Sequence, residues 1–184
     1  MVLLRSEQKI NIGDKAPEFS LIGIDDNEHS LESIKGSKAT LIVFMCNHCP
    51  YVKPKIEVLK GLVDKYREKG LVVIGINSNE SLNYPEDSFE NMKKVAEEQG
   101  FNFFYLYDET QEVAKEYGAV CTPDPFLFDS DLKLIYHGRL DDAMSPDEEP
   151  SKHDMDEAIS AIIEGKEVDK GFLPSQGCSI KWKD

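Results

Sequence analysis

The sequence predicts an α/β fold in which helices flank a mixed central sheet. Runs of apolar and β-branched residues at 41–44 and 71–77 are typical of strands that are covered on both faces. A helical pattern separates these runs, and a strand, a helix and a strand in this order form a right-handed parallel unit. Two further strands at 126–129 and 132–137, joined by a short turn, must run antiparallel to each other. The sheet is therefore expected to be mixed.

Shorter elements complete the pattern. Apolar residues at 19–24 and 29–31 flank a turn and predict an N-terminal β-hairpin extension. The later elements are expected to be a helix opened by a capping box of Asp87 and Glu90, a strand at 103–107, a short helix ending at Gly118 and a last helix at 154–164. The tail 170–184 has no helical period, so we expect it to be irregular and docked on the body through Ile180 and Trp182.

Length and composition limit the classes of function. With 184 residues and 40% hydrophobic content, the chain suits one domain, 1–184, with a sizeable core. A net charge of −14 repels phosphate backbones and anionic lipids, which argues against nucleic acid and membrane partners. No apolar run reaches the length of a signal peptide core or a membrane span, so we expect a cytoplasmic protein. The composition implies no particular oligomeric state.

The strongest candidate for a reactive site is the segment Cys46-x-x-Cys49. An apolar strand ends just before it and the helical residues Val52 and Ile56 follow it, so Cys49 is expected at a helix N-terminus. Free N–H groups and the helix dipole there lower the pKa of a thiol. The second sulfur can capture a mixed disulfide, so the pair can cycle. The alternative is half of a zinc site with His48 as a ligand, although a second Cys/His pair at ligand spacing is missing.

The order of elements resembles the thioredoxin fold. The segments GDKAPEF at 13–19 and YLYDETQEVAKEYGAVCTPDPFLFD at 105–129 resemble the redoxin branch, the alkyl hydroperoxide reductase/thiol-specific antioxidant family. A subgroup of these thioredoxin-like redoxins shares the motifs CNHCPYV, CTPD and GCSIKW, which stand here at 46–52, 121–124 and 177–182. The resemblance covers nearly the whole chain. It implies a cis peptide bond at Thr122–Pro123, where the fold presents its backbone to an extended substrate.

The chain departs from these relatives at the cysteines. When Phe44 is aligned with the phenylalanine of the thioredoxin motif F-W-A-x-W-C-x-x-C, Cys49 takes the place of the nucleophile and a valine that of the usual resolving cysteine. Cys46, upstream, becomes the candidate resolving cysteine. The peroxiredoxin motif P-x-x-x-T-x-x-C lacks its proline and its threonine, and the position of the peroxiredoxin arginine holds Pro123.

The resemblance favours a thiol-disulfide oxidoreductase that needs neither a cofactor nor a metal. Cys49 is the expected nucleophile and Cys46 the resolving cysteine, while Thr122 and Pro123 shape the substrate groove. His48 is expected to stabilise the thiolate by charge and hydrogen bonding. The expected partners are protein or small-molecule thiols and disulfides, together with a thiol reductant.

Two other functions stay open. The protein could be a thiol peroxidase that reduces hydroperoxides through a sulfenic acid at Cys49. Arg139 would then supply the missing positive charge, unless it pairs with a carboxylate of Asp141-Asp142. The other possibility is a copper chaperone of thioredoxin fold, with Cys46, Cys49 and His137 as ligands.

Cys178 and Cys121 are the remaining cysteines of the chain. Each is a candidate second resolving or relay thiol, because the tail can reach the carboxyl edge of the sheet and Cys121 is close to the expected cis-proline. The alternative for Cys178 is an anchored tail with an inert buried cysteine, since cysteine often behaves as a small hydrophobic residue.

Overall fold

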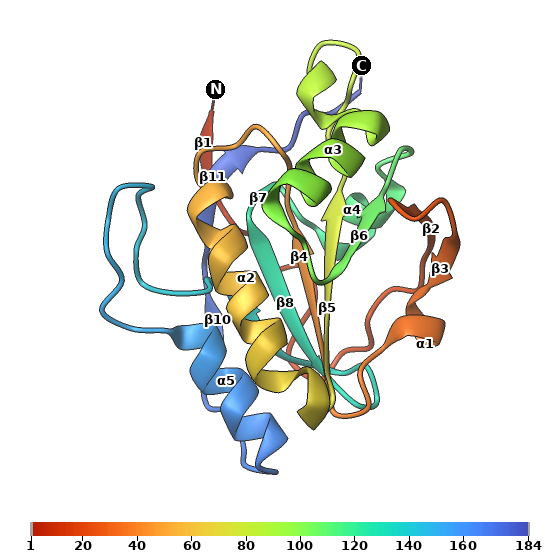
Figure 1. The fold of residues 1–184 in the computed structure, drawn as a ribbon. Helices are drawn as coiled ribbons and strands as arrows, with labels where there is room; N and C mark the ends of the chain where they lie inside the picture. Colours follow the sequence, from red (N-terminus) through yellow and green to blue (C-terminus); the bar gives the residue numbers. More distant parts are fainter. Residues whose placement is uncertain (1, 184) are drawn as a thin grey trace.

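The computed structural model describes residues 2–183, in which the strands form two sheets (Figure 1). The main sheet has eight strands in the order β10-β9-β8-β4-β5-β6-β2-β3. These strands are β2 (Ser20–Gly23), β3 (Glu28–Ser30), β4 (Ala39–Phe44), β5 (Leu71–Asn77), β6 (Phe104–Tyr107), β8 (Asp124–Asp129), β9 (Leu134–Gly138) and β10 (Gly171–Leu173). The α-helices are α1 (Leu31–Ile34), α2 (Lys53–Tyr66), α3 (Phe89–Gln99), α4 (Glu112–Tyr117) and α5 (Asp154–Ile163).

Strand β4 lies at the centre of the main sheet, and all of its residues are buried. It runs parallel to β5 and antiparallel to β8, which confirms the predicted mixed sheet. Because strand side chains alternate, Leu41 and Val43 join the core under α2, α3 and α5, whereas Ile42 and Phe44 join the core under α4. Helices therefore cover both faces of the sheet (Figure 1).

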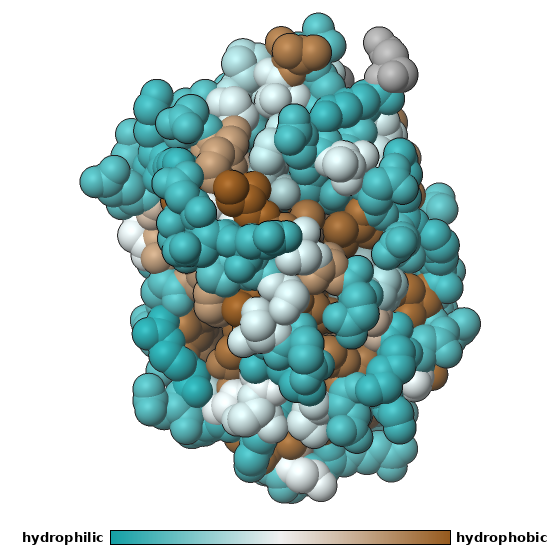
Figure 2. All heavy atoms as spheres, turned by 90° about the vertical axis from the view of Figure 1, so that its right-hand side faces the viewer, coloured by the Kyte–Doolittle hydropathy of each residue, from teal (hydrophilic) through white to brown (hydrophobic). Residues whose placement is uncertain are grey.

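The predicted N-terminal hairpin is confirmed. Strands β2 and β3 pair antiparallel, and β2 also pairs with β6, so the hairpin extends one edge of the main sheet. Figure 2 shows this side of the molecule, where hydrophilic side chains cover most of the surface and apolar atoms show in a band across its middle. A hollow on the hairpin side is lined partly by Ile24, Phe103 and Phe104.

The C-terminal tail is more regular than expected. It forms β10, which pairs with β9, and β11 (Gln176–Ser179). Strand β11 lies between β1 (Leu3–Arg5) and β7 (Cys121–Thr122) in a second, three-stranded antiparallel sheet. Ile180 is 3% exposed and Trp182 is 40% exposed, so the apolar side chain that packs on the body is the isoleucine.

The start of α3 also differs from the prediction. The N-cap is Ser88, whose Oγ accepts a hydrogen bond from the Asn91 N–H, and not Asp87. Asp87 ends the short 3-10 helix η2 (Pro85–Asp87), and its carboxylate is buried. That carboxylate is therefore available for contacts elsewhere. Among the helices of residues 2–183, none is long and apolar enough to cross a membrane.

Candidate active site

The two cysteines of the motif lie on the connection between β4 and α2. Strand β4 ends at Phe44, and α2 begins only at Lys53, so Cys49 precedes the helix instead of opening it. The connection is nevertheless tight, because the N–H groups of Val52 and Lys53 both donate to the Cys49 carbonyl. Both sulfurs are enclosed, since Cys46 is 1% and Cys49 0% exposed.

The peptide bond between Thr122 and Pro123 is cis, as the resemblance implied. It joins β7 to β8 and turns both polar groups of Thr122 toward the cysteines. The Thr122 carbonyl oxygen lies 3.3 Å from Cys49 Sγ, and the Thr122 hydroxyl lies 3.3 Å from Cys46 Sγ. A single residue of the cis-proline segment thus contacts both thiols.

Cys178 completes the group of sulfurs. Its Sγ lies 2.6 Å from Cys49 Sγ, about 0.6 Å longer than a covalent S–S bond. Strand β11 creates this contact, because the register of its pairing places Cys178 opposite Thr122. The tail therefore brings a third sulfur onto Cys49, from the far end of the chain.

Cys49 is the thiol that the site activates. Hydrogen bonding to Cys46 first, and then to Cys178 and the backbone of Tyr51, lowers the pKa of Cys49 to about 5, against the opposing effect of burial. The pKa values of the two neighbouring thiols, Cys46 and Cys178, shift in the opposite direction. Hydrogen bonding to Cys49 raises the pKa of Cys46 well above its usual range, and burial, reinforced by contact with Cys49, raises the pKa of Cys178 to about 12. At neutral pH the arrangement favours one thiolate held by two thiols.

This arrangement predicts the thiol titration. We expect the reduced protein to carry about one thiolate at pH 7, with a midpoint near 5, and the Cys49→Ser variant to carry essentially none. The measurement is the ultraviolet thiolate absorbance of both proteins as a function of pH. A midpoint above 8, or the same titration in both proteins, would show that the site does not activate Cys49.

Asp87 is a buried carboxylate beside the motif. It accepts hydrogen bonds from the Asn47 N–H at 2.7 Å and the Asn79 side-chain amide at 2.7 Å, and its Oδ2 lies 2.5 Å from His48 Nδ1. The hydrogen bond to Asp87 raises the pKa of His48, and the charge of Cys49 acts in the same direction. The face of the His48 ring stacks on the ring of Tyr84. His48 is thus held in place beside the cysteines by Asp87.

The sequence interpretation missed Asp87 as a site residue, because it took the residue for a helix cap. A usable signal was present. Asp87 follows β5, and the carboxyl ends of the adjacent parallel strands β4 and β5 lie at the same edge of a sheet. A carboxylate that follows β5 can therefore reach the loop that follows β4.

Among the described residues, Cys46, His48 and Asp87 form the group whose ligand atoms could converge on a metal ion, with all three atoms within 4.8 Å of one another. His137, the imidazole expected to help bind copper, is not part of it. His137 is fully buried, its Nε2 lies 2.8 Å from Asp124 Oδ1, and its ring stacks on Phe126. The histidine that lies at the cysteines is His48, which is part of the motif itself.

Cys121 and Arg139 lie around the site without a hydrogen bond to Cys49. Burial raises the pKa of Cys121 far above its usual range, and its side chain contacts Ser6. Arg139 donates from Nε to Asp154 Oδ2 at 2.7 Å, so its partner is neither of the two aspartates considered from the sequence. The guanidinium charge is therefore already paired.

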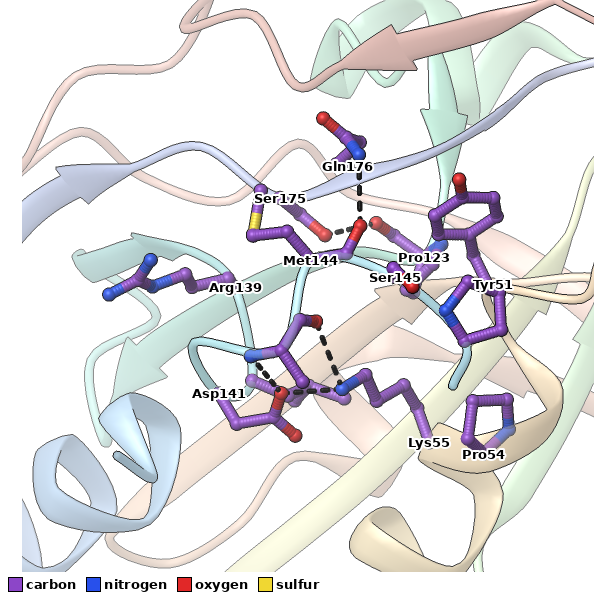
Figure 3. Close-up of a pocket in the computed structure, with 13 residues that line it drawn as sticks. Tyr51, Pro54, Lys55, Pro123, Arg139, Asp141, Met144, Ser145, Ser175 and Gln176 are labelled. Carbon is purple, nitrogen blue, oxygen red and sulfur yellow. Dashed lines mark hydrogen bonds and ion pairs between the residues drawn. The ribbon is translucent and has the colours of Figure 1, made fainter. Parts of the chain in front are cut away.

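A narrow pocket lies beside Pro123, between the start of α2 and the loop after β9 (Figure 3). Lys55 on α2 reaches Asp141 on that loop at 2.5 Å, and the Gln176 side-chain amide donates to the Met144 carbonyl at 2.9 Å. The pocket leaves about 10 Å³ of solvent-accessible space, roughly the room for one water molecule. Loop and tail together close this side of the cis-proline segment.

Known proteins share this framework. Residues 12–137 match the AhpC/TSA family. The chain is 49% identical to an uncharacterized conserved protein from Geobacillus kaustophilus, whose crystal structure superposes with a TM-score of 0.91 over 100% of this chain and 97% of that one. A hypothetical protein from Sinorhizobium meliloti is 38% identical, with a TM-score of 0.91 over 97% and 98% of the two chains.

A relative with a described activity is the thiol-disulfide oxidoreductase ResA of Bacillus thuringiensis subsp. konkukian. It is 28% identical over 129 residues, which make up 70% of each chain. The family match runs from before β2 to residue 137 in β9, and it includes Cys46, Cys49 and the cis-proline segment. By this match the chain belongs to the AhpC/TSA family and has the thioredoxin-like fold of the redoxins.

Proposed function

We propose that the protein is a thiol-disulfide oxidoreductase in which Cys49 is the nucleophile. The observation that carries the proposal is the lowered pKa of Cys49 within hydrogen-bonding contact of two thiols whose pKa values are raised. A low pKa provides the attacking thiolate, and a nearby thiol provides the means to release the product. The kinship with ResA proteins supports the same class of reaction.

The reaction would proceed in two exchanges. The Cys49 thiolate attacks one sulfur of a substrate disulfide, forms a mixed disulfide and expels the other sulfur as a thiolate, which takes up a proton. Cys46 then loses its proton and attacks Cys49 Sγ, which releases the second substrate thiol and leaves a Cys46–Cys49 disulfide. The substrate gains two electrons and the protein loses two. A thiol reductant returns them.

Asp87 and His48 are placed to take the proton that Cys46 loses. The Cys46 sulfur, a ring nitrogen of His48 and an Asp87 oxygen lie within 4.8 Å of one another. Once Cys49 is held in the mixed disulfide, burial and the charge of Asp87 still oppose ionisation of Cys46, so the second exchange needs a base close by. In this proposal His48 supports the Cys49 thiolate before the reaction and the Asp87–His48 pair receives a proton during it.

The resolving thiol can be identified by mapping disulfides after limited oxidation with glutathione disulfide. We expect Cys46→Ser to yield a Cys49–Cys178 bond and Cys178→Ser to yield a Cys46–Cys49 bond, because both sulfurs lie against Cys49. The doubly substituted protein should retain one glutathione on Cys49. Cys121→Ser is the matched control and should behave as the wild type. Glutathione retained on Cys121 would contradict the assignment of the nucleophile.

A second function, thiol peroxidase, is favoured by the contact between Cys49 and Cys178. A hydroperoxide would oxidise the Cys49 thiolate to a sulfenic acid and leave as an alcohol. Cys178, 2.6 Å away, would then form the disulfide and release water. Against this function, Arg139 is paired with Asp154 and offers no positive charge to Cys49. If the protein consumes peroxide more slowly than it reduces a disulfide at the same substrate concentration, disulfide reduction is its main activity.

We also propose the cytoplasm as the place of action. Cys46, Cys49 and Cys121 are thiols in the structure instead of members of a disulfide framework, and a working thiol pair needs a supply of reductant. Fractionation of the source cells with an antibody against the protein would test this placement.

A further inference from the structure

The cis-proline segment has a partner strand within its own chain. In the second sheet β7 is an end strand, and its neighbour is β11 of the tail. The pairing is antiparallel and places Cys178 opposite Thr122 and Ser179 opposite Cys121. The backbone edge that faces the active thiol is therefore occupied by a strand whose cysteine lies on Cys49.

Strands β11 and β7 approach so closely that only glycine fits at the position before Cys178. A Cβ on Gly177 would lie 1.9 Å from the Thr122 carbonyl oxygen and 2.6 Å from its carbon. Both atoms belong to the backbone of the cis-proline segment and cannot move aside easily. A strand that brings a sulfur to Cys49 along this edge must therefore have glycine immediately before its cysteine.

We propose that β11 is an internal stand-in for the substrate, and that an extended polypeptide with a Gly-Cys sequence takes its place on β7 when its disulfide is reduced. The proposal rests on the proposed oxidoreductase function and adds to it a class of substrate. Addition of a strand to a free sheet edge is a common way to bind a peptide, since the main chain supplies the affinity and side-chain pockets the selectivity. Here the edge becomes free only when β11 leaves.

The contacts of β11 are compatible with departure. Its outer neighbour, β1, is an exposed strand of three residues. Strand β11 is held by its pairing with β1 and β7, and the tail is also held at its ends, where the Ser175 Oγ donates to the Pro123 carbonyl and the Lys181 N–H donates to Asn79 Oδ1. Of the four residues of β11, only Cys178 belongs to the hydrophobic core, and short strands with few buried apolar contacts open at lower free energy than a protein's core. An opening of this kind lowers the apparent affinity for the substrate by the fraction of molecules that are open.

Departure of β11 also determines which thiol resolves the mixed disulfide between Cys49 and the substrate. With the substrate strand on β7, Cys178 is displaced and Cys46 remains beside Cys49. Cys46 then attacks Cys49 Sγ, the peptide leaves as a thiol, and the bond between Cys46 and Cys49 forms as the mixed disulfide breaks. Small disulfides, which need no strand position, can be resolved by either thiol.

A pair of peptides tests the glycine requirement. The first has the sequence of residues 175–181, with its cysteine linked to thionitrobenzoate through a disulfide, and the second has alanine in place of its glycine. Release of thionitrobenzoate measures attack by Cys49. We expect the glycine peptide to react about tenfold faster than the alanine peptide, while 2-hydroxyethyl disulfide provides the reference rate. Equal rates for the two peptides would overturn the proposal.

The matched variants are Gly177→Ala and Gly61→Ala. The first disturbs the pairing of β11, whereas Gly61 is exposed on α2 and a Cβ there meets no atom within 4 Å. We expect Gly177→Ala to raise the rate ratio of the glycine peptide to 2-hydroxyethyl disulfide about tenfold, and Gly61→Ala to leave it unchanged. An unchanged rate ratio in the Gly177→Ala protein would contradict the proposal. A wild-type protein inert toward both substrates would instead refute the proposed function.

A labelling experiment on the wild type does not depend on the folding of a variant. The peptide with serine in place of cysteine can occupy β7 without reacting. We expect saturation with it to increase alkylation of Cys178 by N-ethylmaleimide, measured by mass spectrometry, because β11 must leave to make room. Unchanged or reduced alkylation would show that the peptide does not replace β11.

Discussion

Replacing Cys49 with serine is expected to reduce disulfide exchange by at least about a thousandfold, to the uncatalysed rate. The reason is the distribution of pKa values among the cysteines: that of Cys49 is lowered to about 5, while those of Cys46 and Cys178 are raised. Removal of Cys49 takes away the hydrogen bond and the charge that raise the pKa of both neighbours, but burial still raises the pKa of each of them. The measurement is the initial rate of glutathione disulfide reduction.

Cys121→Ser is the control for this loss. Cys121 is equally buried, but it lies against Ser6 and its pKa is raised by burial. We therefore expect the exchange rate of the Cys121→Ser protein to stay within about twofold of the wild-type rate. If Cys49→Ser kept a tenth or more of the wild-type rate, Cys46 or Cys178 would be able to act as nucleophile. The two-exchange scheme would then fail at its first step.

The frame of this site was predictable because its signals are local. The uninterrupted apolar run of β4 indicates a central strand, and the periodic residues after Cys49 indicate the helix. Together they place the motif on a connection at the carboxyl end of the sheet. The cause of the low pKa was not predictable in the same way. Helix α2 begins only at Lys53, and the main stabilisation of the thiolate comes from hydrogen bonds with Cys46, which require the folded loop.

The tail strand could not be predicted from its own sequence. Strand β11 has four residues and pairs with β1, at the opposite end of the chain, and with β7, which has two residues. The stability of such strands depends on their cross-strand neighbours, so no periodicity within the tail indicates them. The proximity of Cys178 to Cys49 follows from this pairing. A sequence argument could suggest that the tail reaches the site but could not specify the contact.

Asp87 should have the second largest effect, on stability. Its carboxylate is buried and accepts hydrogen bonds from Asn47, His48 and Asn79. We expect Asp87→Ala to lower the free energy of unfolding by about 3–5 kcal/mol, because it leaves three buried or half-buried donors without an acceptor. Asp87→Asn keeps the shape and should cost about 1–3 kcal/mol. The exposed neighbour provides the control, Glu86→Gln, which should stay within about 0.5 kcal/mol in denaturant titrations.

The pH dependence separates the charge of Asp87 from its packing. Hydrogen bonding to Asp87 raises the pKa of His48 in the folded protein above its unfolded value. A group of this kind contributes stability that is fully present below the unfolded pKa, about 6.5 for histidine, and is lost as the pH rises through the folded pKa. The difference in unfolding free energy between the wild type and Asp87→Asn should therefore be largest near about pH 6 and shrink as the pH is raised into the alkaline range. A difference that stays constant across this range would mean that His48 is neutral in the folded protein, and that Asp87 positions it without charging it.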